Sequence, residues 1–148
     1  MRQLMAATAE LIDALEISEL EDDRYWVFLL DEKTSVEADF DEESERLTLS
    51  SDVGVVPAEK REETFQTCLI YNSLWRQTGG ARFGLDSFKE TIELVLDLPA
   101  AKLEPQILHG ILANFLTAVR GWRMVIESNA SADLKQDLLG DLSGGIRV

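Results

Sequence analysis

The sequence has few of the residues that most often carry chemistry. It contains one cysteine and one histidine among 148 residues, Cys68 and His109. A single cysteine excludes an internal disulfide and any metal site built from several cysteines, and it suits a reducing cytoplasm. His109 has neither a cysteine nor clustered carboxylates at ligand spacing, so we expect a partly exposed helix residue. The sequence therefore predicts no metal, no cofactor and no enzyme activity.

Cations are also scarce. The chain has 14 Lys and Arg against 28 Asp and Glu, a net charge of -14 with a pI near 4.4. The excess is concentrated in residues 1–63, which hold 19 acidic and 6 basic residues, whereas residues 64–148 hold 9 and 8. DNA, RNA and anionic membranes each require a cationic face, so we expect none of them as a partner. Basic or charge-mixed proteins are the expected partners.

Long apolar runs are missing too. No stretch approaches the roughly 18–20 apolar residues that span a bilayer. The N-terminal MRQLMAATAELIDAL could pass for a signal peptide, but Glu10 and Asp13 interrupt it, so we expect an amphipathic helix over residues 3–17. The length suits one domain, which we place at 1–128, followed by a flexible or weakly docked tail at 129–148. We expect a cytoplasmic protein.

The chain alternates between two kinds of periodicity. Three segments of period two, Tyr25–Asp31, Ser35–Phe40 and Arg46–Ser50, predict an antiparallel meander. Pro57 begins a predicted helix that runs to Gln77, and a glycine of positive φ at Gly79 or Gly80 is expected to end it.

Three further elements follow the glycines. Arg82–Asp86 is expected to be extended, and the alternation over Ile92–Leu98 favours a strand, with a helix as the competing interpretation. Pro105 begins a last long helix. The resulting order, α-β-β-β-α-β-β-α, predicts an α+β fold in which an antiparallel twisted sheet packs with three helices.

Two local motifs have simple structural interpretations. The stretch GGARFG lacks the lysine and hydroxyl of a phosphate-binding loop and follows a helix, so we expect a helix-ending turn. Asp86 is expected to cap or end its strand. Cys68 lies among apolar residues and is expected to be a buried, inert thiol.

The unusual feature is an excess of apolar faces. In RYWVFLLDE, Tyr25 and Val27 alternate with Trp26 and Phe28, so this strand is apolar on both sides. The helix from Pro57 is similar: Phe65, Leu69 and Asn72 line one side, and Ile70, Tyr71, Leu74 and Trp75 continue around it. Either one monomer buries both faces, or two partner surfaces cover them, one for self-association and one for a client. We favour the second interpretation.

Several stretches resemble a known family. NSLWRQTGGARFGLD, the strand TIELVLDLPA and the helix LHGILANFLTAVRGW are similar to those of class I type III secretion chaperones, the Tir chaperone family. The resemblance covers about residues 1–127. It implies a homodimer without cofactor or catalytic step, which binds the N-terminal segment of a secreted effector, keeps it extended and escorts it to the export machinery. The ATPase of the secretion apparatus is a further partner to consider.

This resemblance suggests candidate interaction residues. For the effector we expect contributions from the first helix and first strand, namely Leu4, Leu11, Leu15, Trp26, Phe28 and Leu30. For self-association we expect residues around the glycine turn, namely Leu74, Trp75, Phe83 and Leu85.

Three alternatives stay open. A small enzyme would need a deep polar pocket into which His109, Asp86 or glutamate side chains converge. An acidic inhibitor or nucleic-acid mimic that binds a basic partner would have a similar composition, but its carboxylates should form a continuous surface. A related bacterial domain could share the fold without a role in secretion.

Overall fold

The computed structural model describes residues 1–12, 16–20, 24–86 and 88–127. In chain order the elements are α1 (Arg2–Ala9), β1 (Glu16–Leu20), β2 (Tyr25–Asp31), β3 (Thr34–Asp41), β4 (Arg46–Val55), the short 3₁₀ helix η1 (Ala58–Lys60), α2 (Arg61–Ser73), β5 (Arg82–Asp86), β6 (Thr91–Pro99), the 3₁₀ helix η2 (Ala100–Lys102) and α3 (Pro105–Glu127). The predicted α+β class, with an antiparallel sheet and three α-helices, is confirmed.

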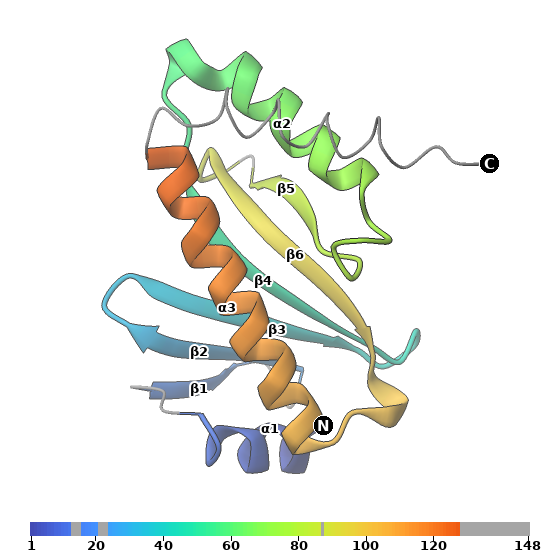
Figure 1. Cartoon of the computed structure of the whole chain (residues 1–148). Helices are drawn as coiled ribbons and strands as arrows, with labels where there is room; N and C mark the ends of the chain where they lie inside the picture. Colours follow the sequence, from blue (N-terminus) through green and yellow to red (C-terminus); the bar gives the residue numbers. More distant parts are fainter. Residues whose placement is uncertain (13–15, 21–23, 87, 128–148) are drawn as a thin grey trace, which may run out of the picture.

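Six strands form one antiparallel sheet in the order β1-β2-β3-β4-β6-β5 (Figure 1). Alternation along β4 shows how its two faces arise. Leu47, Leu49 and Val53 are buried, and the intervening Thr48 and Ser50 are not. Because successive side chains of a strand point to opposite faces, β4 contributes apolar side chains to the inner face of the sheet and polar ones to the outer face.

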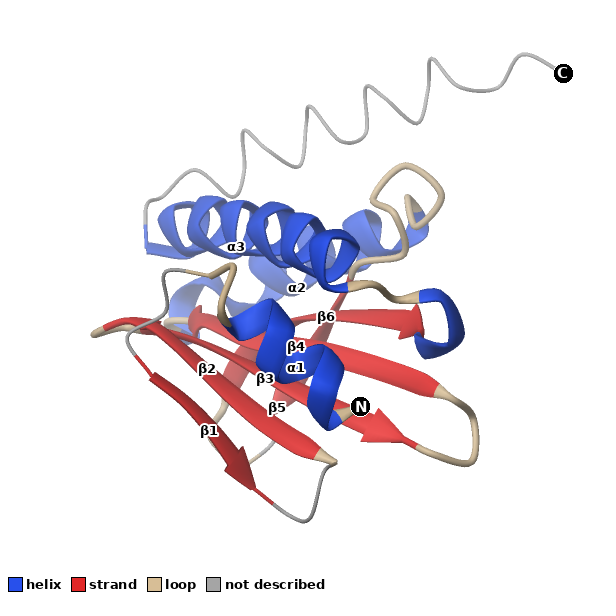
Figure 2. Ribbon diagram, turned by 90° about the horizontal axis from the view of Figure 1, so that it is seen from below, coloured by secondary structure: helices blue, strands red, loops and turns tan. Residues whose placement is uncertain are grey.

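The helices lie on the inner face, and none of the described helices covers the outer face (Figure 2). On α3 the buried residues recur at helical spacing: Leu108, Leu112, Phe115, Val119 and Ile126. This stripe confirms the predicted helix, and it packs on the buried residues of β2, β3, β4 and β6 in one core. α1 packs beside α3 at one end, and α2 lies over β5 at the other (Figure 1).

Arg123 fixes α3 to the sheet by hydrogen bonds. Its guanidinium donates to the carbonyl oxygen of Asp52 from Nε at 3.0 Å and from Nη2 at 2.7 Å. Nη1 donates to the hydroxyl of the buried Thr34 at 2.7 Å. Three hydrogen bonds from one side chain satisfy polar groups of β3 and β4 that the helix would otherwise cover unpaired.

The N-terminal region differs from the prediction. The expected helix over residues 3–17 is wrong in its second half, because α1 ends at Ala9 and Glu16–Leu20 form the edge strand β1. Ile17 packs against the core opposite Phe28, its register partner on β2. The apolar pattern at Leu4, Leu11 and Leu15 suited a helix, but pairing with β2 determines the conformation of residues 16–20.

The region around the glycines follows the prediction more closely. α2 ends at Ser73 and not at Gln77, and turns continue to Gly80. Both Gly79 and Gly80 have positive φ, 66° and 90°. The strands expected at Arg82–Asp86 and Ile92–Leu98 are present as β5 and β6, so the helix interpretation of the latter is wrong.

Two predictions concern other parts of the chain. The tail expected at 129–148 lies outside the described residues, so its conformation stays a prediction. Within the described residues, no helix is both long and apolar enough to cross a membrane.

Candidate interaction surfaces

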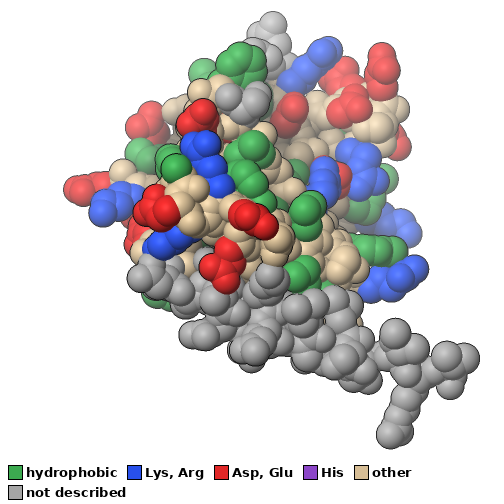
Figure 3. Space-filling view, turned by 90° about the horizontal axis from the view of Figure 1, so that it is seen from above, with side chains coloured by type: hydrophobic (Ala, Val, Ile, Leu, Met, Phe, Trp, Pro, Cys, Tyr) green, Lys and Arg blue, Asp and Glu red, His purple; other side chains and the backbone are tan. Residues whose placement is uncertain are grey.

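The largest apolar exposure on α2 and β5 forms one surface. Leu69 of α2 is 67% exposed and Leu85 of β5 is 55% exposed. They line a groove of about 300 Å³ together with Phe65, Cys68, Asn72, Phe83, Gly84 and Ile92. We call this surface the α2–β5 face. Figure 3 shows the molecule from the α2 end, where hydrophobic side chains are exposed between charged ones.

Asn72 closes the free edge of β5 beneath this face. Its Oδ1 accepts a hydrogen bond from the Phe83 backbone N–H at 2.7 Å, and its Nδ2 donates to the Phe83 carbonyl oxygen at 3.1 Å. β5 pairs with β6 on its other side. A side-chain amide thus replaces the pairing that a neighbouring strand would supply at this residue.

The residues expected around the glycine turn divide into two groups. Leu74 and Phe83 are buried, 6% and 8% exposed, and contribute to the packing of the monomer. The Phe83 ring packs tilted against Tyr71 and edge-to-face with Trp122, at centroid distances of 5.0 and 4.6 Å. Trp75 is 53% exposed, with the Arg76 guanidinium 4.3 Å from its ring centroid. Only Trp75 and Leu85 of the four expected residues are therefore open to a partner in this chain.

A second groove lies between α1, β2 and α3. It has a volume of about 350 Å³ and is lined by Ile12, Leu30, His109, Leu112, Ala113, Leu116, Thr117 and Arg120. Arg120 forms an ion pair with Asp31 at 3.2 Å on the rim. Leu11, next to Ile12, is 44% exposed. We call this the α1–α3 groove.

The residues expected to contact the effector differ in their exposure and in their position relative to the α1–α3 groove. Leu30 lines the α1–α3 groove, Leu11 is exposed beside it, and Leu4 is half-buried against the core. Trp26 and Phe28 point to the helices and are 2% and 1% exposed, so they pack in the core of the monomer, and their expected contribution to effector binding stays a prediction. Leu15 lies outside the described residues.

Some residues of the apolar surfaces are not among the expected ones, namely the half-buried Phe65 and the exposed Leu69 and Phe88. The helical spacing of Phe65 and Leu69 placed both on one side of their helix, and this spacing was the signal that could have indicated an apolar surface there. Neither residue was included in the expected interface. Phe88, 97% exposed between β5 and β6, gave no signal because it is a single apolar residue in a turn. Asp86 holds this turn by accepting hydrogen bonds from the backbone N–H groups of Phe88 and Lys89, as its expected capping role requires.

The candidate chemical groups of the sequence are Cys68, His109 and the carboxylates. No group of three or more His, Cys, Asp or Glu side chains among them could hold a metal ion. Burial raises the pKa of the Cys68 thiol to about 12, as expected for a thiol that stays protonated. His109 is partly exposed on α3, where the sequence predicted it.

Among the described residues, six strands form a sheet that carries three α-helices on one face, with apolar grooves beside the helices. The profile of the Tir chaperone protein (CesT) family matches residues 7–123. The chain therefore belongs to this family, and the predicted resemblance is confirmed. A search of curated proteins gave no significant match.

Solved structures support the same conclusion. A chain in the crystal structure of the ExsC–ExsE complex is similar at 26% identity with a TM-score of 0.71, and the match covers 84% of this chain and 91% of that one. The HopA1–SchA chaperone–effector complex matches at 19% identity and 0.63, covering 82% and 91%. The Yersinia pestis type III secretion chaperone SycH, in complex with a fragment of YscM2, matches at 16% and 0.55, covering 82% and 97%. The last two comparisons show the shared fold.

Proposed function

We propose that this protein is a non-catalytic cytoplasmic chaperone that binds the N-terminal region of a type III secreted effector and keeps it extended for export. Family membership over residues 7–123 is the observation that carries the proposal. The similarity to a chain from a chaperone–effector complex supports it. Such a protein needs apolar surface and hydrogen-bonding edges, and it needs no reactive group.

The α1–α3 groove and the β1 edge suit an effector segment that has no fold of its own. Among the described strands, β1 pairs only with β2, so its other edge can accept an added strand. Backbone pairing tolerates varied sequences, whereas the groove beside Leu11 and Leu30 offers room for apolar side chains. Ordering a disordered segment costs about 2–5 kcal/mol, so a broad contact is required.

We place self-association on the α2–β5 face. Leu69 and Leu85 expose apolar area that a second copy of the chain would bury, and Trp75 adds to it at the end of α2. A two-fold dimer would also duplicate the effector-binding surface. The acidic surface elsewhere would keep the free dimer soluble. The ATPase of the secretion apparatus is a candidate partner of the loaded chaperone.

The first test is size-exclusion chromatography with light scattering, on the protein alone and co-expressed with the protein encoded beside its gene. We expect a dimer of about twice 16.6 kDa that retains the neighbour and protects its N-terminal segment from protease. A monomer that retains no neighbour would contradict the proposal. Release of the partner by DNA would favour an acidic nucleic-acid mimic instead.

Two matched variants locate the effector surface. Leu11→Glu places a charge beside the α1–α3 groove, and Ile107→Glu places one on α3 away from it, at similar exposure of 44% and 49%. We expect only Leu11→Glu to reduce retention of the neighbour while both variants stay dimeric. Equal retention by the two would exclude this groove as the binding surface.

A further inference from the structure

The outer face of the sheet is a second surface that the described helices leave open (Figure 2). On β1 and β2 it carries an apolar stripe of Leu20, Tyr25, Val27 and Leu29. The register places Leu20 opposite Tyr25, and Ser18 opposite Val27. Leu20 is 49% exposed, and the three β2 residues are half-buried. This stripe is too narrow to attract an apolar partner by itself.

Carboxylates follow the stripe across the next strands. Glu37 and Asp39 of β3 alternate with the buried Val36 and Ala38, so they point outward. Asp52 of β4 is the register partner of Glu93 on β6. Asp97 of β6 lies farther along the same face, where it forms an ion pair with Arg82 at 2.8 Å. Acidic groups from three neighbouring strands therefore lie beside the apolar stripe.

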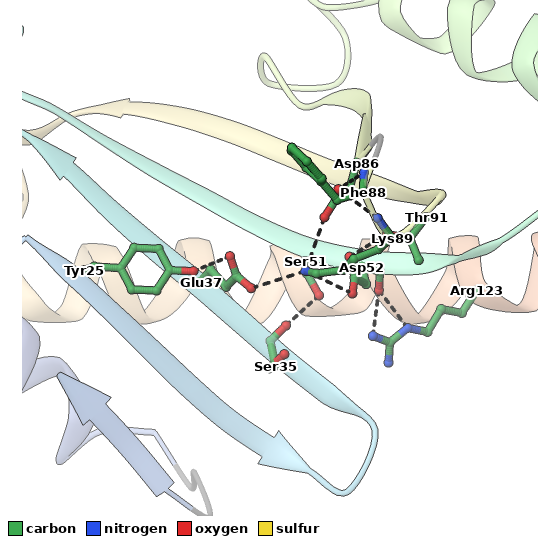
Figure 4. A network of polar contacts seen from close by, with 10 residues as sticks. All are labelled: Tyr25, Ser35, Glu37, Ser51, Asp52, Asp86, Phe88, Lys89, Thr91 and Arg123. Carbon is green, nitrogen blue, oxygen red and sulfur yellow. Dashed lines mark hydrogen bonds and ion pairs between the residues drawn. The ribbon is translucent and has the colours of Figure 1, made fainter. Parts of the chain in front are cut away.

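One primary amine is already held on this face, as Figure 4 shows. The Lys89 ammonium lies 3.4 Å from a carboxylate oxygen of Asp86, 3.9 Å from one of Asp52 and 4.0 Å from one of Glu37. Its side chain remains 51% exposed. Lys89 lies in the turn between β5 and β6. Its ammonium group is therefore held among three carboxylates on a face that no described helix covers.

Other polar side chains orient these carboxylates. The Tyr25 hydroxyl donates a hydrogen bond to Glu37, and the Thr91 hydroxyl donates one to Asp52 at 3.1 Å (Figure 4). Tyr25 belongs to the apolar stripe, so it joins the stripe to the acidic groups. The two parts of the outer face form one continuous surface.

The negative charge of this surface exceeds what Lys89 neutralises. Burial raises the pKa of the Glu93 carboxyl, and the neighbouring carboxylates of Asp52 and Asp86 raise it further, whereas Lys89 lowers it. A carboxyl whose ionisation is disfavoured by its neighbours gains from a further cation nearby. The surface thus has the electrostatic character that favours a positively charged partner.

We propose that the outer sheet face binds a basic, extended segment of the effector, in which Lys or Arg side chains contact Glu37, Asp52 and Glu93. In an extended chain every second side chain faces the sheet, so cations can alternate with groups that point away. Apolar side chains near the ends of the segment would contact the stripe at Tyr25 and Val27. This inference rests on the proposed function and assigns a second, electrostatic contact to the same partner.

The test uses the full chain and two short labelled peptides, one with lysine alternating with valine and one with glutamate in place of lysine. We expect the lysine peptide to bind, the glutamate peptide not to bind, and affinity to fall as NaCl rises from about 50 to 300 mM. The double variant Glu37→Gln/Glu93→Gln should bind the lysine peptide about three- to ten-fold more weakly. Absence of lysine-peptide binding, or equal binding of both peptides, would overturn the proposal.

A matched double variant separates a local site from net charge. Glu62→Gln/Glu63→Gln removes the same charge from the exposed first turn of α2, away from the outer face. We expect it to leave peptide affinity unchanged, and an equal loss in both double variants would overturn the proposal. Asp39→Asn, exposed on the same face, repeats the test if Glu37→Gln/Glu93→Gln unfolds.

Retention of the neighbouring gene product distinguishes this inference from the proposed function. If the unaltered protein does not retain that product, the proposed function fails. If retention is normal and insensitive to both Glu37→Gln/Glu93→Gln and salt, only the outer-face inference fails. Weaker retention by Glu37→Gln/Glu93→Gln alone would support both.

Discussion

The inner face of the sheet is closed at its centre and open at one end. Beneath α3, side chains such as Phe28, Leu49 and Leu94 are no more than 1% exposed. On the α2–β5 face, Leu69 and Leu85 are more than half exposed. Leu85 and the buried strand residues follow the same alternation, in which every second side chain of a strand points inward. The difference in their exposure therefore lies in the helices that cover them. α3 spans the central strands, whereas α2 contacts β5 and covers no other strand closely (Figure 1).

The two regions are joined by a small aromatic cluster. Tyr71 of α2, Phe83 of β5 and Trp122 of α3 contact one another at centroid distances of 4.6–5.1 Å. The cluster fixes α2 to α3 near the end of α2. Along the rest of α2, the exposed side chain of Leu69 is available to a partner. An apolar side chain that points inward therefore stabilises the monomer only where a second layer of the fold packs against it.

The largest expected effect comes from truncation in the closed centre. Phe28→Ala should lower the free energy of unfolding by about 3–5 kcal/mol, because it removes a fully buried ring and leaves a cavity under α3. Urea unfolding followed by circular dichroism measures this loss. Val27→Ala, on the opposite side of the same strand, should cost much less. Similar losses for the two variants would mean that the two sides of β2 are equally covered.

This contrast shows what the sequence could predict in β2. Alternation in YWVFLL assigns Trp26 and Phe28 to one side and Tyr25 and Val27 to the other, and the structure has these two sets. It does not indicate which side faces the helices, because both sets are apolar. That choice depends on where α3 packs, which is a tertiary property. The sequence alone therefore does not indicate that Trp26 and Phe28, expected at the effector surface, pack beneath the helices.

In the other elements, the sequence predicted the features that depend on local residue type and spacing, and it missed those that depend on contacts between elements. The long stripe of α3 and the positive φ at Gly79 and Gly80 follow from residue type and spacing, and both were predicted. β1 was missed because EISEL is short, acidic and mostly exposed, so pairing with β2 and not propensity makes it a strand. The grooves could not be predicted, since each combines residues from separate elements.

The second prediction concerns the open end. Leu85→Glu should weaken self-association by at least about 2 kcal/mol, because it would bury a charge at the centre of the proposed interface. Light scattering over a range of protein concentrations measures the dissociation constant. Leu20→Glu is the matched control, since Leu20 has a similar exposure of 49% on β1. A dimer disrupted by Leu20→Glu and not by Leu85→Glu would move the interface away from α2 and β5.

The third prediction concerns Asn72, which supports the free edge of β5 beneath the α2–β5 face. Asn72→Ala leaves the Phe83 backbone N–H and carbonyl without their side-chain partner and should cost about 1–3 kcal/mol of stability. Asn72→Asp keeps an acceptor for the N–H but cannot donate to the carbonyl, so an intermediate loss is expected in thermal unfolding. Unchanged stability in both variants would mean that water satisfies this edge equally well.

The smallest effect is expected at Glu93, on the outer face of the sheet. Glu93 is the register partner of Asp52 on β4 and of Gly84 on β5, and burial and the neighbouring carboxylates raise its pKa above the ordinary 4.5. A raised carboxyl pKa means that ionisation costs stability above the folded-state pKa, and that this cost disappears as the pH falls below 4.5. Glu93→Gln should therefore stabilise the protein at pH 7 by about 0.3–0.5 kcal/mol, a small gain because the side chain is only partly buried, on a face that no described helix covers.

The pH dependence of this stability gain shows whether it comes from removal of the Glu93 charge. Thermal unfolding of the parent protein and Glu93→Gln should differ at pH 7 and converge below the ordinary pKa of the carboxyl, where both side chains are neutral. Glu62→Gln, on α2, should not reproduce this profile. If Glu93→Gln instead destabilised the protein at pH 7, attraction to Lys89 would outweigh repulsion from Asp52 and Asp86. The outer face would then be electrostatically balanced by its own lysine, and a basic segment would gain little by binding there.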